Sequence, residues 1–229
     1  MKTYKIHMIR NGLTKGNLAG AYIGTTDEPL CPEGIAGILD LKEKYGYPLA
    51  DHIFTSPLKR CQETARLIYP DFPTAIIGEL RECDFGAFEG KTPDELKIDP
   101  AYKAWLSGNA DACPPNGESN RAFATRVLGG FCRIVDGMIA SGVQQTAVIT
   151  HGGAIMAILA AYGVPQMPMS EWLTPAGCGY TVLITPGLWA SHKKLEVYCD
   201  VPELPMTNEE EAQLWDWYPE ETNTSGFLS

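Results

Sequence analysis

The sequence contains no apolar run that approaches the ~20 residues a membrane-spanning helix needs, and its first residues lead into a strand-like segment rather than an apolar signal region. It also has no Cys-x-x-Cys pair. Its seven cysteines are an odd number scattered along the chain, which suits free thiols in a reducing compartment better than a disulfide framework. These absences exclude a membrane protein and predict a cytoplasmic location.

Positive charge is scarce as well. The chain has 28 aspartate and glutamate residues against 18 lysine and arginine residues, a net charge of −10. An acidic surface repels nucleic acid and anionic membranes, so a bound anion has to be held by a local cluster of arginine and histidine. No group of histidines, cysteines and carboxylates has metal-ligand spacing, and we therefore expect no metal and no cofactor.

The sequence shows no internal repeat and no low-complexity tract, and 45% of its 229 residues are hydrophobic, enough for one substantial core. We predict a single domain over residues 1–201. Residues 202–229 are an acidic extension rich in proline and glutamate, yet Trp215, Trp217 and Tyr218 make it apolar in places. This extension is predicted to form a short helix that packs on the domain or on a second subunit of a homodimer.

Short apolar runs alternate with amphipathic segments along the first domain. Strands are predicted at residues 3–9, 52–55, 74–77, 145–150, 180–185 and 194–198. Helices are predicted at residues 32–45, 57–69, 93–106 (one or two pieces), 118–140 and 153–162. In the second of these helices, Ser56 is the expected N-cap and Pro57 the first helical residue. The alternation predicts an α/β protein, a three-layer α/β/α sandwich with a mostly parallel central sheet.

Chemically suggestive groups follow three of the predicted strands. Arg10 and Asn11 come directly after the first strand, Arg60 lies in the first turn of the helix after the second, and His151 follows the strand at 145–150. Gly152 and the glycine after it open a helix, so free N–H groups lie beside that histidine. Ligands bind outside the carboxyl ends of parallel strands, and these residues therefore predict a phosphate-sized oxyanion pocket.

Four segments in this order carry a family resemblance. They are Arg10-Asn11-Gly12-Leu13-Thr14, Ser56-Pro57-Leu58-Lys59-Arg60, the Leu-x-Glu-x-x-x-Gly-x-x-Glu-Gly run from Leu80 to Gly90, and His151-Gly152. From about residue 4 to 200 the chain resembles the histidine phosphatase superfamily, which implies the phosphoglycerate mutase-like fold. The one departure is Asn11, where the family motif has a histidine.

The resemblance implies a role for each matched residue. The histidine of the motif takes the phosphoryl group, and water then removes it. Arg10, Arg60 and His151 hold the transferring oxygens, while Glu82 protonates the leaving oxygen and then activates the water. Asn11 has no basic nitrogen with which to attack phosphorus, so the chain is predicted to bind phosphate esters and to turn them over very poorly.

Two explanations of Asn11 stay open. Either the parent protein has histidine there and the asparagine is a substitution that disarms the enzyme or traps its substrate, or the chain is a natural pseudophosphatase, a phosphate-ester binding module. Because Glu82 matters only for chemistry and is retained, the first is favoured. His7 is four strand residues away, roughly 13 Å, and cannot replace the nucleophile. His52 and His192 lie at or near strand starts, away from the carboxyl ends, and are therefore expected to be structural.

Within the family, the residues favour a phosphatase over a mutase. Ile23 and Cys83 stand where phosphoglycerate mutases carry a threonine and an arginine, and Pro114–Ser119 looks like the branch that includes the ribazole phosphatases. We therefore expect hydrolysis of a small phosphorylated metabolite, with inorganic phosphate as product. Asn17 and Gly24 match substrate-binding positions, although Asn17 is equally suited to capping a turn. Three aromatic residues can either stack on a ring of the substrate or simply pack in the core: Tyr102, Trp105 and Trp172.

Overall fold

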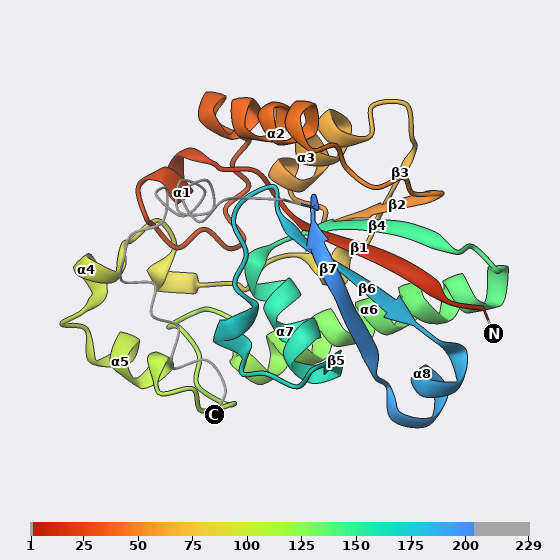
Figure 1. Cartoon of the computed structure of the whole chain (residues 1–229). Coiled ribbons are helices and arrows are strands. Elements are labelled where there is room, and N and C mark those ends of the chain that lie inside the picture. Colours follow the sequence, from red (N-terminus) through yellow and green to blue (C-terminus); the bar gives the residue numbers. More distant parts are fainter. Residues whose placement is uncertain (1, 204–229) are drawn as a thin grey trace.

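The structure of the protein is a computed structural model that describes residues 2–203. It is built on a seven-stranded sheet in the order β3-β2-β4-β1-β6-β7-β5 (Figure 1). The strands are β1 (Tyr4–Arg10), β2 (His52–Thr55), β3 (Thr74–Ile76), β4 (Gln145–Thr150), β5 (Gly163–Val164), β6 (Gly179–Ile184) and β7 (Leu195–Val201). The predicted extension and its expected helix lie almost entirely outside the described residues.

The sheet is mixed. Strands β3, β2, β4 and β1 run parallel, which places their carboxyl ends along one edge. Strand β6 is antiparallel to both β1 and β7, while β5 is parallel to β7. The predicted α/β class is confirmed, and the part of the sheet formed by β3, β2, β4 and β1 is parallel. Strands β6 and β7 are joined by a connection too short for a parallel crossover, so β7 returns antiparallel.

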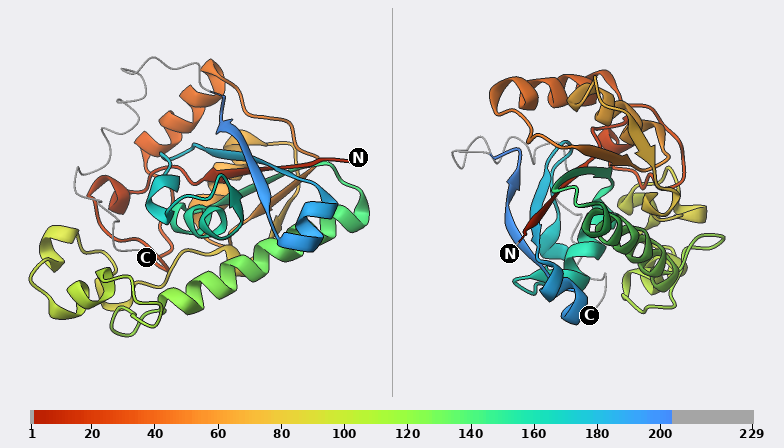
Figure 2. Two further views of the ribbon diagram at one scale, coloured as in Figure 1. Left: turned by 60° about the horizontal axis from the view of Figure 1, so that its bottom comes forward. Right: turned by 90° about the vertical axis from the view of Figure 1, so that its right-hand side faces the viewer.

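Helices cover both faces of the sheet, which confirms the predicted three layers (Figures 1 and 2). Helices α2 (Pro32–Lys44) and α3 (Lys59–Ile68) lie on one face, and α6 (Asn120–Ser141) and α7 (Gly152–Tyr162) lie on the other. The shorter elements are α1 (Lys15–Leu18), α4 (Pro93–Leu96), α5 (Pro100–Leu106), α8 (Pro186–His192) and the 3₁₀ turns η1 (Gly78–Leu80), η2 (Gly86–Phe88) and η3 (Met169–Trp172).

Strand β1 is buried on both faces, as a central strand must be. Ile6 and Met8 belong to the core beneath α6 and α7, while Ile9 belongs to the core beneath α2 and α3. The three side chains are fully buried, and each such burial contributes about 1.5–3 kcal/mol. The alternation along the strand therefore ties both helical layers to the element that delivers Arg10 and Asn11.

Helix α3 begins later than the sequence predicts. Its N-cap is Leu58, which has extended backbone angles, and its first helical residue is Lys59, so Ser56 and Pro57 precede the helix. The Ser56 hydroxyl lies 2.7 Å from Nε2 of His151 and also accepts a hydrogen bond from the Leu58 N–H at 3.4 Å. Ser56 therefore contacts the site from a position two residues before the N-cap.

An aromatic cluster closes the end of the molecule where α4 and α5 lie (Figure 1). Phe88, Tyr102 and Trp105 are buried there, with Tyr22 and Phe85 packed against them. Within the described part of the chain, no helix combines the length and the hydropathy needed to cross a membrane.

Candidate active site

The residues predicted from the sequence meet at the carboxyl ends of β1, β2 and β4. Arg10 pairs with Thr150 in the parallel ladder, and the Asn11 N–H donates to the Thr150 carbonyl at 2.8 Å. This register places Asn11 next to His151. Both follow the last residue of their strand, so the backbone brings them together before any side-chain contact is made.

The imidazole of His151 is buried, with 1% of its surface exposed. Its Nδ1 lies 3.0 Å from Oδ1 of Asn11, and its Nε2 lies 2.7 Å from Oγ of Ser56. Burial, followed by the charges of Arg60 and Arg10, holds the pKa of His151 well below its usual value, so the ring is neutral. Asn11 Nδ2 donates to the Gly12 carbonyl, which leaves Oδ1 facing the ring, and Arg60 Nε lies 3.3 Å from the same Nδ1.

The guanidinium of Arg60 is 2% exposed and is oriented by backbone oxygens. Nη1 donates to Thr26 O at 2.9 Å and Nη2 donates to Gly24 O at 2.7 Å. Among the described residues no carboxylate forms an ion pair with Arg60, so its charge is oriented without being neutralised. Such a group attracts an anion.

The loop that supplies these oxygens is held by Glu89. Its carboxylate accepts hydrogen bonds from the backbone N–H groups of Gly24, Thr25 and Thr26 at 2.9–3.3 Å. The Phe85 N–H donates to the same carboxylate at 3.1 Å. Two residues of this loop, Gly24 and Thr26, therefore donate their N–H groups to Glu89 while their carbonyls accept from Arg60.

Glu82 lies on the other side of the site and is 8% exposed. Oε1 accepts from the Cys83 N–H at 2.9 Å, and Oε2 accepts from the Gly153 N–H at 3.1 Å. Burial raises the pKa of Glu82, and these two hydrogen bonds and the charges of Arg60 and Arg10 only partly oppose that increase. A carboxyl with a raised pKa is suited to carrying a proton that it can donate.

These groups surround one cavity of about 170 Å³. Arg10, Asn11, Arg60, Glu82 and His151 make up its polar end. The remainder of its wall is largely apolar and includes Ala21, Tyr22, Ile23, Phe85, Phe123, Met156, Met169 and Leu173. The cavity therefore has a charged end of phosphate size and an uncharged end that can hold a larger group.

The predicted substrate-binding residues are placed in different ways. Asn17 and Gly152 line the cavity, and Asn17 also caps α1 through Thr14, so both interpretations of that asparagine are compatible with the structure. Gly24 acts through its carbonyl on Arg60. Of the two roles open to Tyr102, Trp105 and Trp172, the structure supports core packing: all three are buried in the core and none lines the cavity.

The remaining histidines lie elsewhere. His7 Nδ1 contacts Thr181 Oγ1 at 3.0 Å, and His52 and His192 are exposed at the start of β2 and the end of α8. Across residues 2–203 no group of three or more histidine, cysteine, aspartate or glutamate side chains is arranged to hold a metal ion. All seven cysteines are free thiols.

Sequence reasoning missed several contacts at the site. Ser56 was read as a helix cap, and the contact of Arg10 Nη1 with the Thr174 carbonyl at 2.7 Å had no signal in the sequence. Glu89 did have one, because it is the glutamate that ends the quoted Leu80–Gly90 run. The contacts of Glu118 and Arg126 with the segment around Glu82 were missed as well.

The fold and the site together define an α/β protein whose oxyanion pocket lies at the carboxyl ends of parallel strands. The family model described as "Histidine phosphatase superfamily (branch 1)" matches residues 6–194. The chain belongs to this superfamily.

Named relatives and solved structures agree with this membership. The chain is 32% identical over 179 residues to the adenosylcobalamin/alpha-ribazole phosphatase of Escherichia coli, covering 76% of this chain and 87% of that protein. It is 30% identical over 165 residues to the 2,3-bisphosphoglycerate-dependent phosphoglycerate mutase of Methylobacterium radiotolerans, covering 66% and 76%. The crystal structure of the alpha-ribazole phosphatase from Shigella flexneri superposes with a TM-score of 0.69 at 28% identity, covering 85% and 94%.

Proposed function

We propose that this chain binds a small phosphomonoester, and that with histidine at position 11 it hydrolyses that ester through a phosphohistidine. One observation carries the proposal: Arg10, Arg60, His151 and Glu82 converge around position 11 in a single cavity. The two arginines supply charge for the phosphoryl oxygens, and His151 lies directly beside position 11.

In the proposed reaction, the imidazole introduced by Asn11→His attacks phosphorus while Glu82 donates its proton to the leaving oxygen. The alcohol departs and a phosphohistidine remains. Glu82, now ionised, removes a proton from water, the water oxygen attacks phosphorus, and inorganic phosphate is released. Without the nucleophile the first step has no attacking nitrogen, and loss of a covalent nucleophile costs on the order of 10⁴ to 10⁶ in rate.

The shape of the cavity supports a phosphatase with an uncharged leaving group. Arg10 and Arg60 are the cationic side chains among the described residues of its wall, enough for one phosphate, and its far end is apolar. A mutase that binds a bisphosphate needs charge at both ends and is less well supported. Relatives named adenosylcobalamin/alpha-ribazole phosphatase suggest an alpha-ribazole phosphate or a similar phosphorylated metabolite as the ester.

The second candidate is a natural pseudophosphatase that binds phosphate esters without turnover. The hydrogen bond between Asn11 Oδ1 and His151 Nδ1 favours it, because the asparagine side chain gives the buried imidazole a hydrogen-bond partner. The two candidates share the pocket and differ only in what a histidine at position 11 would do.

The deciding experiment compares the chain with its Asn11→His variant on several phosphomonoesters, including an aryl phosphate, with phosphorus NMR to detect phosphohistidine. We expect hydrolysis and a phosphohistidine signal only in the variant, both lost on adding Arg60→Ala. A variant that binds inorganic phosphate but shows neither signal identifies a binding module. Absence of phosphate binding in both proteins contradicts the pocket itself.

A further inference from the structure

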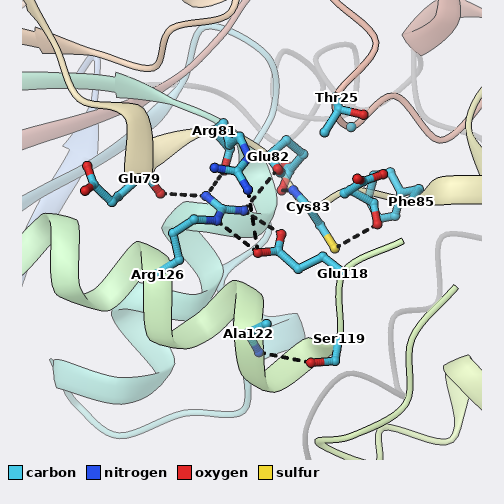
Figure 3. Close-up of polar contacts among 12 residues, drawn as sticks. Thr25, Glu79, Arg81, Glu82, Cys83, Phe85, Glu118, Ser119, Ala122 and Arg126 are labelled. Carbon is cyan, nitrogen blue, oxygen red and sulfur yellow. Dashed lines mark hydrogen bonds and ion pairs between the residues drawn. The ribbon is translucent and has the colours of Figure 1, made fainter. Parts of the chain in front are cut away.

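Beside the cavity, on the far side of Glu82, a partly buried ion pair joins α6 to the segment before it (Figure 3). Arg126 Nε donates to Glu118 Oε1 at 2.9 Å and Nη2 donates to Oε2 at 2.6 Å. The two side chains are only 13% and 11% exposed. This is a two-point contact between a guanidinium and a carboxylate, the geometry that fixes direction as well as distance.

The other donors of Arg126 all go to one short piece of backbone. Nη1 donates to Glu79 O at 2.7 Å and to Arg81 O at 3.0 Å, and Nη2 donates to Glu82 O at 3.3 Å. Figure 3 shows these contacts reaching the turn that carries the Glu82 side chain. Glu118 thus orients the guanidinium of Arg126, and the guanidinium hydrogen-bonds to the backbone carbonyl of Glu82.

Two further hydrogen bonds fix the turn that carries Glu82. The Glu118 N–H donates to Asp84 O at 2.9 Å, and the Thr150 hydroxyl donates to Leu80 O at 2.8 Å. Thr150 is the last residue of β4 and precedes His151. The turn is therefore fastened both to the strand that delivers His151 and to the start of α6, with the Glu82 carboxylate between them.

Arg126 also faces the wall of the cavity. Its guanidinium carbon lies 5.4 Å from the centre of the Phe123 ring, which lines the apolar end. One side chain on α6 therefore contacts both the backbone of the candidate acid and a residue of the leaving-group end.

We propose that Arg126, aimed by Glu118, is the positioning residue that sets the Glu82 carboxyl at hydrogen-bond distance from the leaving oxygen. The inference deepens the proposed hydrolase function and rests on it. A partly buried ion pair is a poor source of stability, because desolvation offsets the attraction between its charges. A guanidinium that bonds the carbonyls of Glu79, Arg81 and Glu82 instead determines geometry.

The first test uses leaving groups in the Asn11→His background. A p-nitrophenolate leaves without a proton, whereas an alkoxide needs one from Glu82. Arg126→Lys keeps the charge and removes the two-point contact, so we expect it to lower kcat/KM for an alkyl phosphate on the order of 10²-fold while changing kcat/KM for p-nitrophenyl phosphate far less. We use kcat/KM because it reports on formation of the phosphohistidine, whereas the activation of water by Glu82 is common to both esters. Affinity for inorganic phosphate should stay within about twofold.

Helix α6 supplies a matched control. Arg121 forms the same kind of fork with Asp111, at 2.8 and 3.3 Å, but the two side chains are 64% and 73% exposed and lie outside the cavity wall. Arg121→Lys should leave both esters unaffected. Glu118→Gln, which keeps the shape of its side chain, is the second variant if Arg126→Lys does not fold, and it should show the same selective loss.

A second readout needs no catalysis. The Gly153 N–H donates to Glu82 Oε2, so its hydrogen exchange reports where that carboxylate lies. We expect faster exchange at Gly153 in Arg126→Lys and Glu118→Gln than in Arg121→Lys, with asparagine retained at position 11. Equal losses of kcat/KM for both esters, or unchanged exchange at Gly153, would overturn the inference. If Asn11→His is inactive, the proposed function fails, and the exchange measurement still decides whether Arg126 positions Glu82.

Discussion

Nδ1 of His151 and Oδ1 of Asn11 are 3.0 Å apart inside the site. This contact predicts how phosphate affinity changes when the side-chain amide at position 11 is replaced by a carboxylate. Asn11→Asp keeps the side chain's shape and adds a negative charge where the phosphoryl oxygens would lie. Repulsion across a few ångströms in a buried site should lower phosphate affinity by at least about tenfold.

Isothermal titration with inorganic phosphate measures this change. The control is Asn11→Ser, which shortens the side chain without adding charge and should lose much less affinity. Equal affinity in Asn11→Asp and the unmodified chain would show that phosphate does not bind beside position 11.

A substitution at Gly24 tests whether phosphate binding depends on the loop whose carbonyls accept from Arg60. A methyl group there would lie 1.9 Å from Cys83 O and 2.4 Å from Glu89 Oε1, so Gly24→Ala must displace the loop that offers its carbonyl to Arg60. We expect weaker phosphate binding and a lower melting temperature. Gly37→Ala is the control: Gly37 lies on the exposed side of α2 with no neighbour within 4 Å, and alanine should stabilise that helix by about 0.5–1 kcal/mol.

Glu89 is predicted to act on phosphate only through that loop. Glu89→Gln removes the negative charge that collects the N–H groups of Gly24, Thr25 and Thr26, and should cost about 1–3 kcal/mol of unfolding free energy. Hydrogen exchange at those amides should accelerate and phosphate affinity should fall. Glu95→Gln, the same change at an exposed cap of α4, should leave phosphate affinity unaltered. If both variants bind phosphate equally well, the loop does not depend on Glu89.

Two buried histidines make stability depend on pH. Burial, followed by the charge of Lys5, lowers the pKa of His7 to about 4, and the pKa of His151 is also well below its usual value. Below pH 6.5 the unfolded chain binds protons that the folded chain does not, so stability is present above pH 6.5 and is lost as pH falls. Between pH 6.5 and 5 His7 should lower the unfolding free energy by about 1–2 kcal/mol, and His151 should act in the same direction.

Urea unfolding at several pH values measures this loss. The slope of unfolding free energy against pH should be shallower in His7→Gln than in the unmodified chain, whatever the variant's absolute stability. The exposed His192 provides the control, and His192→Gln should retain the full slope. A full slope in His7→Gln would contradict the assignment.

Much of the parallel half of the sheet could be predicted from the sequence, because strands such as β1 and β4 are apolar runs that end at polar residues. The meeting of Arg10, Asn11, Arg60 and His151 followed from that topology, since parallel strands expose their carboxyl ends together. Glu82 was identified only through the family motif. It follows a 3₁₀ turn, and no periodic pattern marks such a position.

The parts that could not be predicted depend on contacts between distant residues. Whether Ser56 caps a helix or contacts His151 is decided by where β4 ends, 95 positions along the chain. In the sequence, nothing distinguishes Arg126 from other charged residues on a helix surface, or Glu118 from other acidic residues, so their two-point contact leaves no signal. Its direction toward Glu82 depends on how α6 lies against the turn, which local patterns do not determine.

The ladder between β1 and β4 has an evolutionary consequence. Because the Asn11 N–H is bonded to Thr150 O, the neighbourhood of position 11 and His151 is set by main-chain register and does not depend on which side chain stands at position 11. Asparagine and histidine codons differ by a single base. Under the proposed function, the scaffold therefore permits loss or recovery of the nucleophile by one point mutation, without rebuilding the fold.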